Sequence, residues 1–157
     1  MQNKITPVTK EMLPEISECY RAAYAQMGED WSAERALEFV KFKFNRYPDL
    51  AFAALVYGKP VGAIFFDIKP WYDGNRLVDG EIFVHPEYQK QGISVLLNRA
   101  LYKVALEKYN CVAVESITFK NKYHLQMYAK IGLFQDPELV FITGNLKEIN
   151  EKINSRC

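Results

Sequence analysis

The sequence has few of the features that mark secreted, metal-binding, nucleic-acid-binding or membrane proteins. Its 157 residues include three cysteines and two histidines, whose positions give no metal-ligand spacing and no disulfide framework. The formal net charge of +1 gives no general attraction to nucleic acid or to an acidic membrane. No apolar run is long enough to span a bilayer, and residues 1–10 lack the apolar core of a signal peptide. We therefore expect a cytoplasmic protein without a metal, a nucleic-acid partner or a membrane partner.

The residues that are present indicate a folded globular protein. Hydrophobic residues make up 49% of the chain and charged residues 25%, which is not the balance of a disordered or fibrous protein. Cys19 and Cys111 fall on segments with an apolar pattern, which predicts a packing role for both. We find no internal repeat, low-complexity segment or linker, so we expect a single domain over residues 1–157.

Hydrophobic spacing and turn residues predict an α/β (α+β) order of elements. Predicted strands cover residues 3–8, 50–57, 61–68, 76–84, 111–117 and 138–146. Predicted helices follow the cap residues Thr9 and Ser32, and further helices cover residues 92–108, 122–134 and 146–153. Tight turns, one of them containing Asp73 and Gly74, should join the second, third and fourth strands into an antiparallel meander. The helix over residues 92–108 should make the fifth strand parallel to the fourth.

The connection between the fourth strand and this helix has the features of an anion site. It reads HPEYQKQGIS over residues 85–94, with no acidic side chain after Glu87. The first amides of a helix have no intrahelical partner and carry partial positive charge. Gly92 lets a ligand approach because it has no Cβ, while Lys90 adds a cation and Ser94 a hydroxyl. The pattern predicts phosphate or pyrophosphate binding; the alternative is an ordinary strand-to-helix turn that binds nothing.

This turn and a second segment resemble two motifs of the GNAT superfamily of N-acetyltransferases. The family's pyrophosphate turn reads Q/R-x-x-G-x-G/A, and QKQGIS over residues 89–94 matches it except at Ser94. The second segment, NKYHLQMYAKIGLF over residues 121–134, has Asn121, Tyr128 and Gly132 where that family's next motif has Asn, Tyr and Gly. It departs from the motif by a histidine at the usual alanine and a leucine inserted before the final phenylalanine. The order of elements agrees over nearly the whole chain.

The resemblance implies a GNAT-like mixed, mostly antiparallel sheet with a splayed parallel strand pair, flanked by helices. It also implies acetyl-CoA, or a related acyl-CoA, as the co-substrate. Main-chain amides of the turn would hold the pyrophosphate, strand edge groups would bond the pantetheine arm, and Asn121 would touch that arm. The turn residues are Gln89, Lys90, Gln91, Gly92, Ile93 and Ser94, and the strand residues are Ile82, Phe83 and Val84.

The same resemblance places Tyr128 near the thioester sulfur. An amine that attacks a thioester must lose a proton, and the departing thiolate is stabilised by a proton donor. Tyr128 is therefore the expected general acid; the alternative is a partly buried helix tyrosine. For the general base we choose Glu81, with Asp79 next, because strand alternation puts Asp79, Glu81 and Phe83 on one face. The alternative for Glu81 is a solvated carboxylate, and His85 is interpreted as part of the turn.

The predicted function is acyl-CoA-dependent N-acetyltransfer to a primary amine by direct attack. The acceptor is a small amine or an exposed amino group of a protein, since Tyr24, Trp31, Trp71 and Tyr72 stand on segments expected to build the acceptor pocket. An alternative is a module on the same fold that binds acyl-CoA or a partner protein without turnover. A homodimer contact through the last strand and helix is compatible with both.

Overall fold

The structure is a computed structural model that describes residues 4–120 and 122–155. It comprises two compact units, one up to Ser116 and one from Ile117 onward, which are described separately. The prediction of a single domain over the whole chain stays a prediction.

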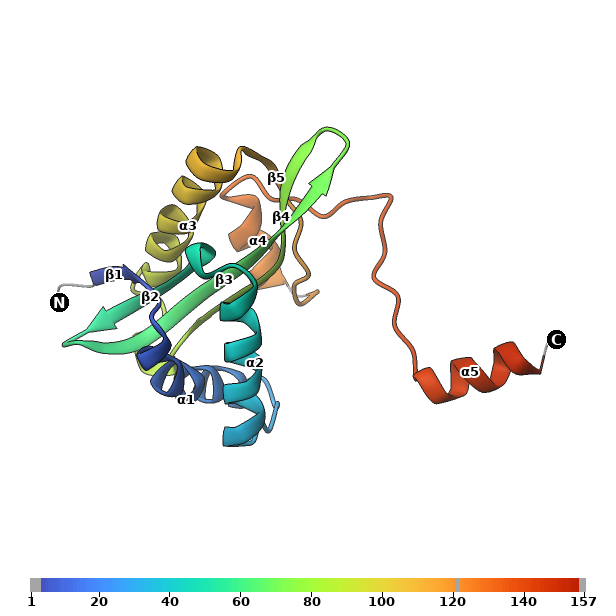
Figure 1. Ribbon diagram of the computed structural model, residues 1–157, viewed down its shortest axis with the longest axis horizontal. Coiled ribbons are helices and arrows are strands. Elements are labelled where there is room, and N and C mark those ends of the chain that lie inside the picture. Colours follow the sequence, from blue (N-terminus) through green and yellow to red (C-terminus); the bar gives the residue numbers. More distant parts are fainter. Residues whose placement is uncertain (1–3, 121, 156–157) are drawn as a thin grey trace. The chain divides into compact units, whose positions relative to one another are not determined.

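The first unit is built on one five-stranded sheet (Figure 1). Its strands are β1 Lys4–Pro7, β2 Ala51–Val56, β3 Lys59–Trp71, β4 Gly74–Val84 and β5 Cys111–Val114, and they lie in the order β1-β2-β3-β4-β5. Neighbouring strands from β1 to β4 are antiparallel, while β4 and β5 are parallel. The predicted meander and the predicted parallel pair are both confirmed.

The helices of this unit begin close to where their cap residues predict. They are α1 Leu13–Ala25, α2 Ala33–Arg46 and α3 Ile93–Tyr109, with short 3₁₀ turns η1 Lys10–Met12, η2 Pro48–Leu50 and η3 Pro86–Tyr88. The Ser32 side chain accepts a hydrogen bond from the Arg35 amide at 3.2 Å, as an N-cap should. Thr9 precedes the 3₁₀ turn instead of α1, so the first α-helix starts three residues later than its cap residue predicts.

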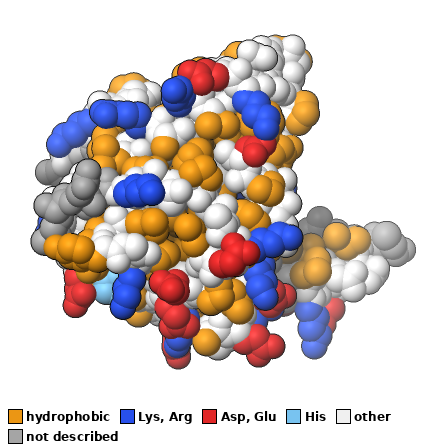
Figure 2. All heavy atoms as spheres, turned by 60° about the vertical axis from the view of Figure 1, so that its left-hand side comes forward, with side chains coloured by type: hydrophobic (Ala, Val, Ile, Leu, Met, Phe, Trp, Pro, Cys, Tyr) orange, Lys and Arg blue, Asp and Glu red, His pale blue; other side chains and the backbone are white. Residues whose placement is uncertain are grey.

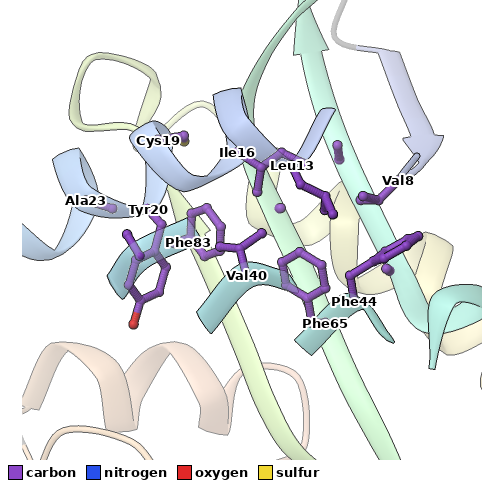
Figure 3. Close-up of a cluster of buried hydrophobic side chains, with 14 residues drawn as sticks. Val8, Leu13, Ile16, Cys19, Tyr20, Ala23, Val40, Phe44, Phe65 and Phe83 are labelled. Atoms are coloured by element: carbon purple, nitrogen blue, oxygen red, sulfur yellow. The ribbon is translucent and has the colours of Figure 1, made fainter. Parts of the chain in front are cut away.

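Two hydrophobic clusters cover the two faces of the sheet. One lies between the sheet and α1 and α2, where Ile16, Tyr20 and Val40 meet Phe65 and Phe83 (Figure 3). The other lies between the sheet and α3 and includes the buried residues Ile64, Phe66, Leu77, Leu97 and Leu101. Cys19 belongs to the first cluster and Cys111 to the second, which confirms the packing role of both. Both are free thiols.

A bulge interrupts the pairing of β3 with β4 and changes which face each β4 side chain meets. Phe65 pairs with Glu81, but Asp67, two residues on, pairs with Val78. Asp79 and Gly80 therefore face a single β3 residue, Phe66. Asp79 has a φ of +50°, a left-handed conformation that Asp tolerates better than most side chains. Alternation holds from Glu81 to Val84, as predicted, and is broken just before it.

The second unit contains α4 Lys122–Ala129 and α5 Leu146–Asn154. The α4 helix ends at Ala129, earlier than the predicted end at residue 134. The predicted left-handed Gly132 follows it with a φ of +87°, and the Leu133 amide bonds to the Tyr128 carbonyl oxygen at 3.0 Å. The predicted helix near residues 146–153 is confirmed as α5, and the Asn145 side chain caps it.

The strand predicted over residues 138–146 is wrong: the structure has no strand there. Four consecutive apolar residues, Leu139, Val140, Phe141 and Ile142, are each at least 69% exposed. Apolar and β-branched composition raises strand propensity, but a strand also needs the main chain of a neighbour. The described residues of this unit contain no other strand that could supply one.

We predict that Gly80→Ala destabilises the protein, because a Cβ at this position would lie 2.2 Å from the Phe66 ring. Overpacking of this kind costs about 1–3 kcal/mol, measured as the free energy of unfolding in urea. Phe66→Leu provides room, so the double variant should lose less stability than the sum of the two single changes. Strict additivity, or a Gly80→Ala variant as stable as the parent, would contradict the close packing.

Candidate functional site

The turn between β4 and α3 presents unpaired main-chain donors at a helix N-terminus. Gly92 is the N-cap of α3 with a φ of +77°, and its carbonyl accepts the amides of Val95 and Leu96 at 3.1 and 3.3 Å. Among the described residues, no acceptor bonds the amides of Gly92, Ile93 or Ser94. A Cβ built on Gly92 would meet nothing within 4 Å, so the space in front of these amides is open. The first turn of α3 also carries no acidic residue, and these features fit a phosphate group.

The turn is held in place by its own hydrogen bonds. The Gln89 side chain donates to the Val84 carbonyl at 3.1 Å, and the Gln91 side chain donates to the Glu87 carbonyl at 3.3 Å. His85 Nδ1 accepts from the Glu87 amide at 3.4 Å, which agrees with its interpretation as part of the turn. These side chains brace the main chain, and so the outward amides are fixed before any ligand binds.

The end of β4 offers a free strand edge to an extended ligand arm. β5 pairs with β4 at Asn75, Arg76 and Leu77, and the Glu115 amide adds a last bond to Leu77 at 2.8 Å. Residues 78–84, which include Ile82, Phe83 and Val84, continue past this pairing without a β5 partner. The main-chain N–H and C=O groups on that side can form hydrogen bonds with an extended ligand, as they would with an added strand.

Glu81 lies beside this edge in a half-buried aromatic environment. The Tyr24 hydroxyl donates a hydrogen bond to Glu81 Oε1. Burial raises the pKa of the Glu81 carboxyl, while the bond from Tyr24 and the charge of Lys43 lower it in part. Burial also raises the pKa of Tyr24, so this phenol stays a donor at neutral pH. A carboxylate with a raised pKa is a stronger base than an exposed one.

Aromatic rings and a second carboxylate surround this pair. Tyr20 contacts Tyr24 in a tilted arrangement with a centroid distance of 4.4 Å and meets the Trp31 ring edge-on at 5.1 Å. Trp31 donates its indole N–H to Glu29 at 2.7 Å. The α1–α2 segment therefore places π-faces and negative charge near Glu81, an environment that suits a cation.

Two of the four aromatic residues expected around an acceptor have another role. Trp71, at the end of β3, lies under Lys69 at 4.5 Å and Arg76 at 5.6 Å. Both cations also pair with Glu115. Tyr72 is 90% exposed in the β3–β4 turn. Of the predicted aromatic set, the structure thus brings Tyr24 and Trp31 into one cluster, around Tyr20.

A buried lysine near Glu81 was missed by the sequence analysis. Lys43 on α2 is 2% exposed, and its ammonium donates to the main-chain carbonyl of Asp79 and, at 2.8 Å, to the Asp79 carboxylate. A second carboxylate, Asp67, lies 3.9 Å from the ammonium. The sequence did hold a signal, because Lys43 follows Ala36 and Val40 at seven and three residues, on the apolar side of α2.

The remaining predicted residues belong to the second unit or lie outside the described residues. Tyr128 stands on α4, in the unit that begins at Ile117, whereas Glu81 and the turn stand in the first unit. Asn121 lies outside the described residues. Their roles stay predictions.

One face of the surface and the described part of the chain bear on three further possibilities: a charged patch, a membrane span and a metal site. On the face shown in Figure 2, hydrophobic, acidic and basic side chains are interspersed, in line with the net charge of +1. Across residues 4–120 and 122–155, no helix combines the length and the apolarity of a membrane span. The same residues contain no group of three or more His, Cys, Asp or Glu side chains placed to hold a metal ion.

Comparisons with known proteins agree with this geometry. Residues 11–133 match the acetyltransferase (GNAT) family. A "possible acetyltransferase" from Clostridium difficile 630 has 16% identity and a TM-score of 0.76, covering 93% of this chain and 99% of that one. A protein of Pyrococcus horikoshii OT3 has 25% identity and a TM-score of 0.70, over 91% and 93% of the two chains.

A third similar structure is AAC(6')-Iy in complex with the bisubstrate analogue CoA-S-monomethyl-acetylneamine. It has 19% identity and a TM-score of 0.66, with 92% of this chain and 99% of that chain covered. No curated protein matches the sequence.

We predict that the free energy of unfolding of Glu81→Gln, taken relative to that of the parent, increases as pH rises. The folded-state pKa of Glu81 lies above its ordinary value of 4.5, so the folded protein binds more protons and the parent loses stability as pH rises through this window. Each unit by which folding raises a carboxyl pKa lowers the free energy of unfolding by about 1.4 kcal/mol at a pH above both pKa values. Urea unfolding from about pH 4 to about pH 8 should show the difference between variant and parent growing and then levelling.

The control for this measurement is Glu107→Gln, which removes an exposed carboxylate of α3. If the difference in free energy of unfolding between Glu81→Gln and the parent shrinks with rising pH, or follows that of the control, the pKa of Glu81 is not raised by burial.

Proposed function

Because the chain belongs to the acetyltransferase (GNAT) family, we propose that it transfers the acetyl group of acetyl-CoA to the nitrogen of a primary amine. Membership of the family supports acyl-CoA-dependent acetyl transfer in general. The nitrogen acceptor and the roles of individual residues are our proposal. The observation that carries it is the turn before α3, where unpaired amides at Gly92, Ile93 and Ser94 open onto free space. Glu81 stands on the strand that leads into this turn.

In this proposal the turn residues Gln89 to Ser94 bind the pyrophosphate through main-chain amides, and Lys90 adds positive charge. Ile82, Phe83 and Val84 bond the pantetheine arm along the free edge of β4, and Asn121 contacts the same arm. When bound, acetyl-CoA supplies an activated acetyl thioester. The open Gly92 and the absence of an acid in the first turn of α3 support this assignment.

Glu81 is the proposed general base. An alkylamine has a pKa of about 10 and arrives mostly as the ammonium ion, which cannot attack. The rings of Tyr20 and Trp31 and the carboxylate of Glu29 favour that cation near Glu81. Glu81 then removes a proton from the nitrogen, directly or through water, while Tyr24 holds Oε1 by its hydroxyl.

Tyr128 is the proposed general acid. A bond forms between the amine nitrogen and the acetyl carbon, and the bond from that carbon to sulfur breaks. Tyr128 gives its hydroxyl proton to the departing sulfur and regains a proton from solvent. The nitrogen loses two protons, one from the ammonium ion before attack and one after the new bond to carbon forms, and both pass through Glu81 to solvent. Tyr128 takes one proton back from solvent, so one proton is released for each acetyl group transferred.

We predict that Ser94→Asp abolishes acetyl-CoA binding without unfolding α3. A negative charge at a helix N-terminus stabilises the helix but repels a diphosphate that the same amides would bind. Acetyl-CoA at one hundred times its Kd should stabilise the parent by about 2.7 kcal/mol, measured as a rise in Tm, and should leave Ser94→Asp unshifted.

Ser94→Asn is the matched control, since it has nearly the same shape without the charge, and it should keep the thermal shift. Equal shifts in the Asp and Asn variants would place the cofactor elsewhere, and no shift in the parent at millimolar cofactor would remove the proposal altogether.

We predict that Tyr128→Phe lowers kcat by at least ~10-fold and leaves acetyl-CoA affinity nearly unchanged. Turnover is followed as release of free CoA with a panel of amines: polyamines, arylalkylamines, peptides with free N-termini and aminoglycosides. The last class is included because AAC(6')-Iy is in complex with a neamine-containing analogue. Full activity in the Phe variant would deprive Tyr128 of its acid role, and no CoA release with any amine would favour the non-catalytic alternative.

A further inference from the structure

We propose that Lys43 is a positioning residue for Glu81, which it serves by fixing the bulge at Asp79 and Gly80 and by facing Glu81 with a positive charge. This inference rests on the proposed function, in which Glu81 is the base. The inference explains why the Lys43 ammonium group is buried, since neither core packing nor the proposed cofactor site requires it there.

Lys43 occupies a position that an apolar side chain would fill at lower cost. Its side chain is 2% exposed, and it lies between Val40 and Phe44 on the side of α2 that faces the sheet. Burying an ammonium group costs several kcal/mol, and buried ion pairs are weak evidence of a stabilising role. The lysine therefore needs an explanation other than stability, and its bonds suggest one.

The bonds of Lys43 converge on the left-handed residue of the bulge. Its ammonium donates both to the main-chain carbonyl and to the side-chain carboxylate of Asp79. Asp79 has a φ of +50°, which costs free energy in a residue other than glycine and persists where surrounding bonds hold it. Lys43 thus links both the main chain and the side chain of Asp79 to α2.

The bulge decides which way Glu81 points. Leu77 packs under α3, and Phe83, two residues after Glu81, packs under α1. In a regular strand Leu77, Glu81 and Phe83 would share one face, because all three are separated by even numbers. The extra residue puts Leu77 on one side of the sheet and Glu81 on the side where Tyr24 reaches it. If the bulge relaxed, Glu81 would lose this direction.

Asp67 supplies the counter-charge that lets Lys43 stay buried. It is 1% exposed, its Oδ2 lies 2.6 Å from Arg46 Nε and 3.9 Å from Lys43 Nζ, and neither oxygen accepts a well-directed hydrogen bond from the described residues. A buried carboxylate in this state holds a nearby cation by charge alone. The Lys43 charge that Asp67 balances lowers the pKa of Glu81.

Charged and titratable groups meet Glu81 from each element packed against it. Lys43 approaches from α2, Tyr24 and Tyr20 from α1, Glu29 from the segment after α1, and Asp79 from β4 itself. Lys43 lowers the pKa of Glu81, and Asp79 and Glu29 raise it. Loss of Lys43 therefore raises the pKa of Glu81 further, so that more of this carboxyl is protonated at a given pH and cannot accept a proton.

The test compares full-length Lys43→Met/Asp67→Asn with Asp67→Asn. The double variant removes both buried charges, so it keeps the interior neutral and avoids the unpaired carboxylate that Lys43→Met alone would leave. Lys41→Met, an exposed lysine on the same helix, is the matched control for charge. The readouts are the Glu81 carboxyl titration by carbon NMR, assigned through its loss in Glu81→Gln, and the Gly80 amide shift.

We expect the Glu81 titration midpoint to lie higher in the double variant than in Asp67→Asn, and the Gly80 amide shift to change. Lys41→Met should match the parent in both. With an amine that supports CoA release, the acidic limb of kcat/KM should move to higher pH and kcat should fall about 10-fold near pH 7, with the KM for acetyl-CoA unchanged.

An unmoved Glu81 midpoint together with an unmoved Gly80 amide would overturn the inference about Lys43, whatever happens to turnover. A midpoint that moves while the acidic limb stays in place would support the positioning role and instead overturn the assignment of Glu81 as base.

Discussion

The extra residue in β4 is the constraint on which the rest of the arrangement depends. A sheet with helices on both faces must send Leu77 toward α3 and Phe83 toward α1, and an even spacing does not permit this in a regular strand. The bulge at Asp79 and Gly80 resolves the conflict. Its cost is local: a left-handed aspartate, a glycine pressed against an aromatic ring, and a buried lysine that binds the main chain and the side chain of that aspartate. Its effect is that a carboxylate meets a tyrosine of α1 beside the free edge of β4.

The same strand leads into the turn that we propose binds the cofactor. β4 leaves its parallel neighbour after Leu77 and continues to η3 paired with β3 alone, so its other edge and the amides that follow belong to one continuous stretch of chain. Gly92 begins α3 in a conformation that favours glycine, and glutamine side chains fix the main chain around it. A main chain held in this way has little left to order on binding, which favours a short turn as the proposed diphosphate site.

Much of this could be predicted from sequence, because its signals are local. The Ser32 cap, the turn at Asp73 and Gly74, and the glycine at the start of α3 each act within a few residues. The bulge could not be predicted, since alternation along one strand does not reveal its register with another. Lys43 was missed because a charged residue is usually assigned to the surface, although its helical spacing placed it in the core. The strand over residues 138–146 failed for the opposite reason: its composition favours a strand, but pairing depends on a distant neighbour.

The buried thiol of Cys19 has a consequence for a protein that handles thioesters. Burial raises the pKa of Cys19 to about 12 and also raises that of Cys111. Sulfur exchanges acyl groups as the thiolate, which such a group almost never forms at neutral pH. Burial therefore disfavours transfer of an activated acetyl group to either of these two sulfurs.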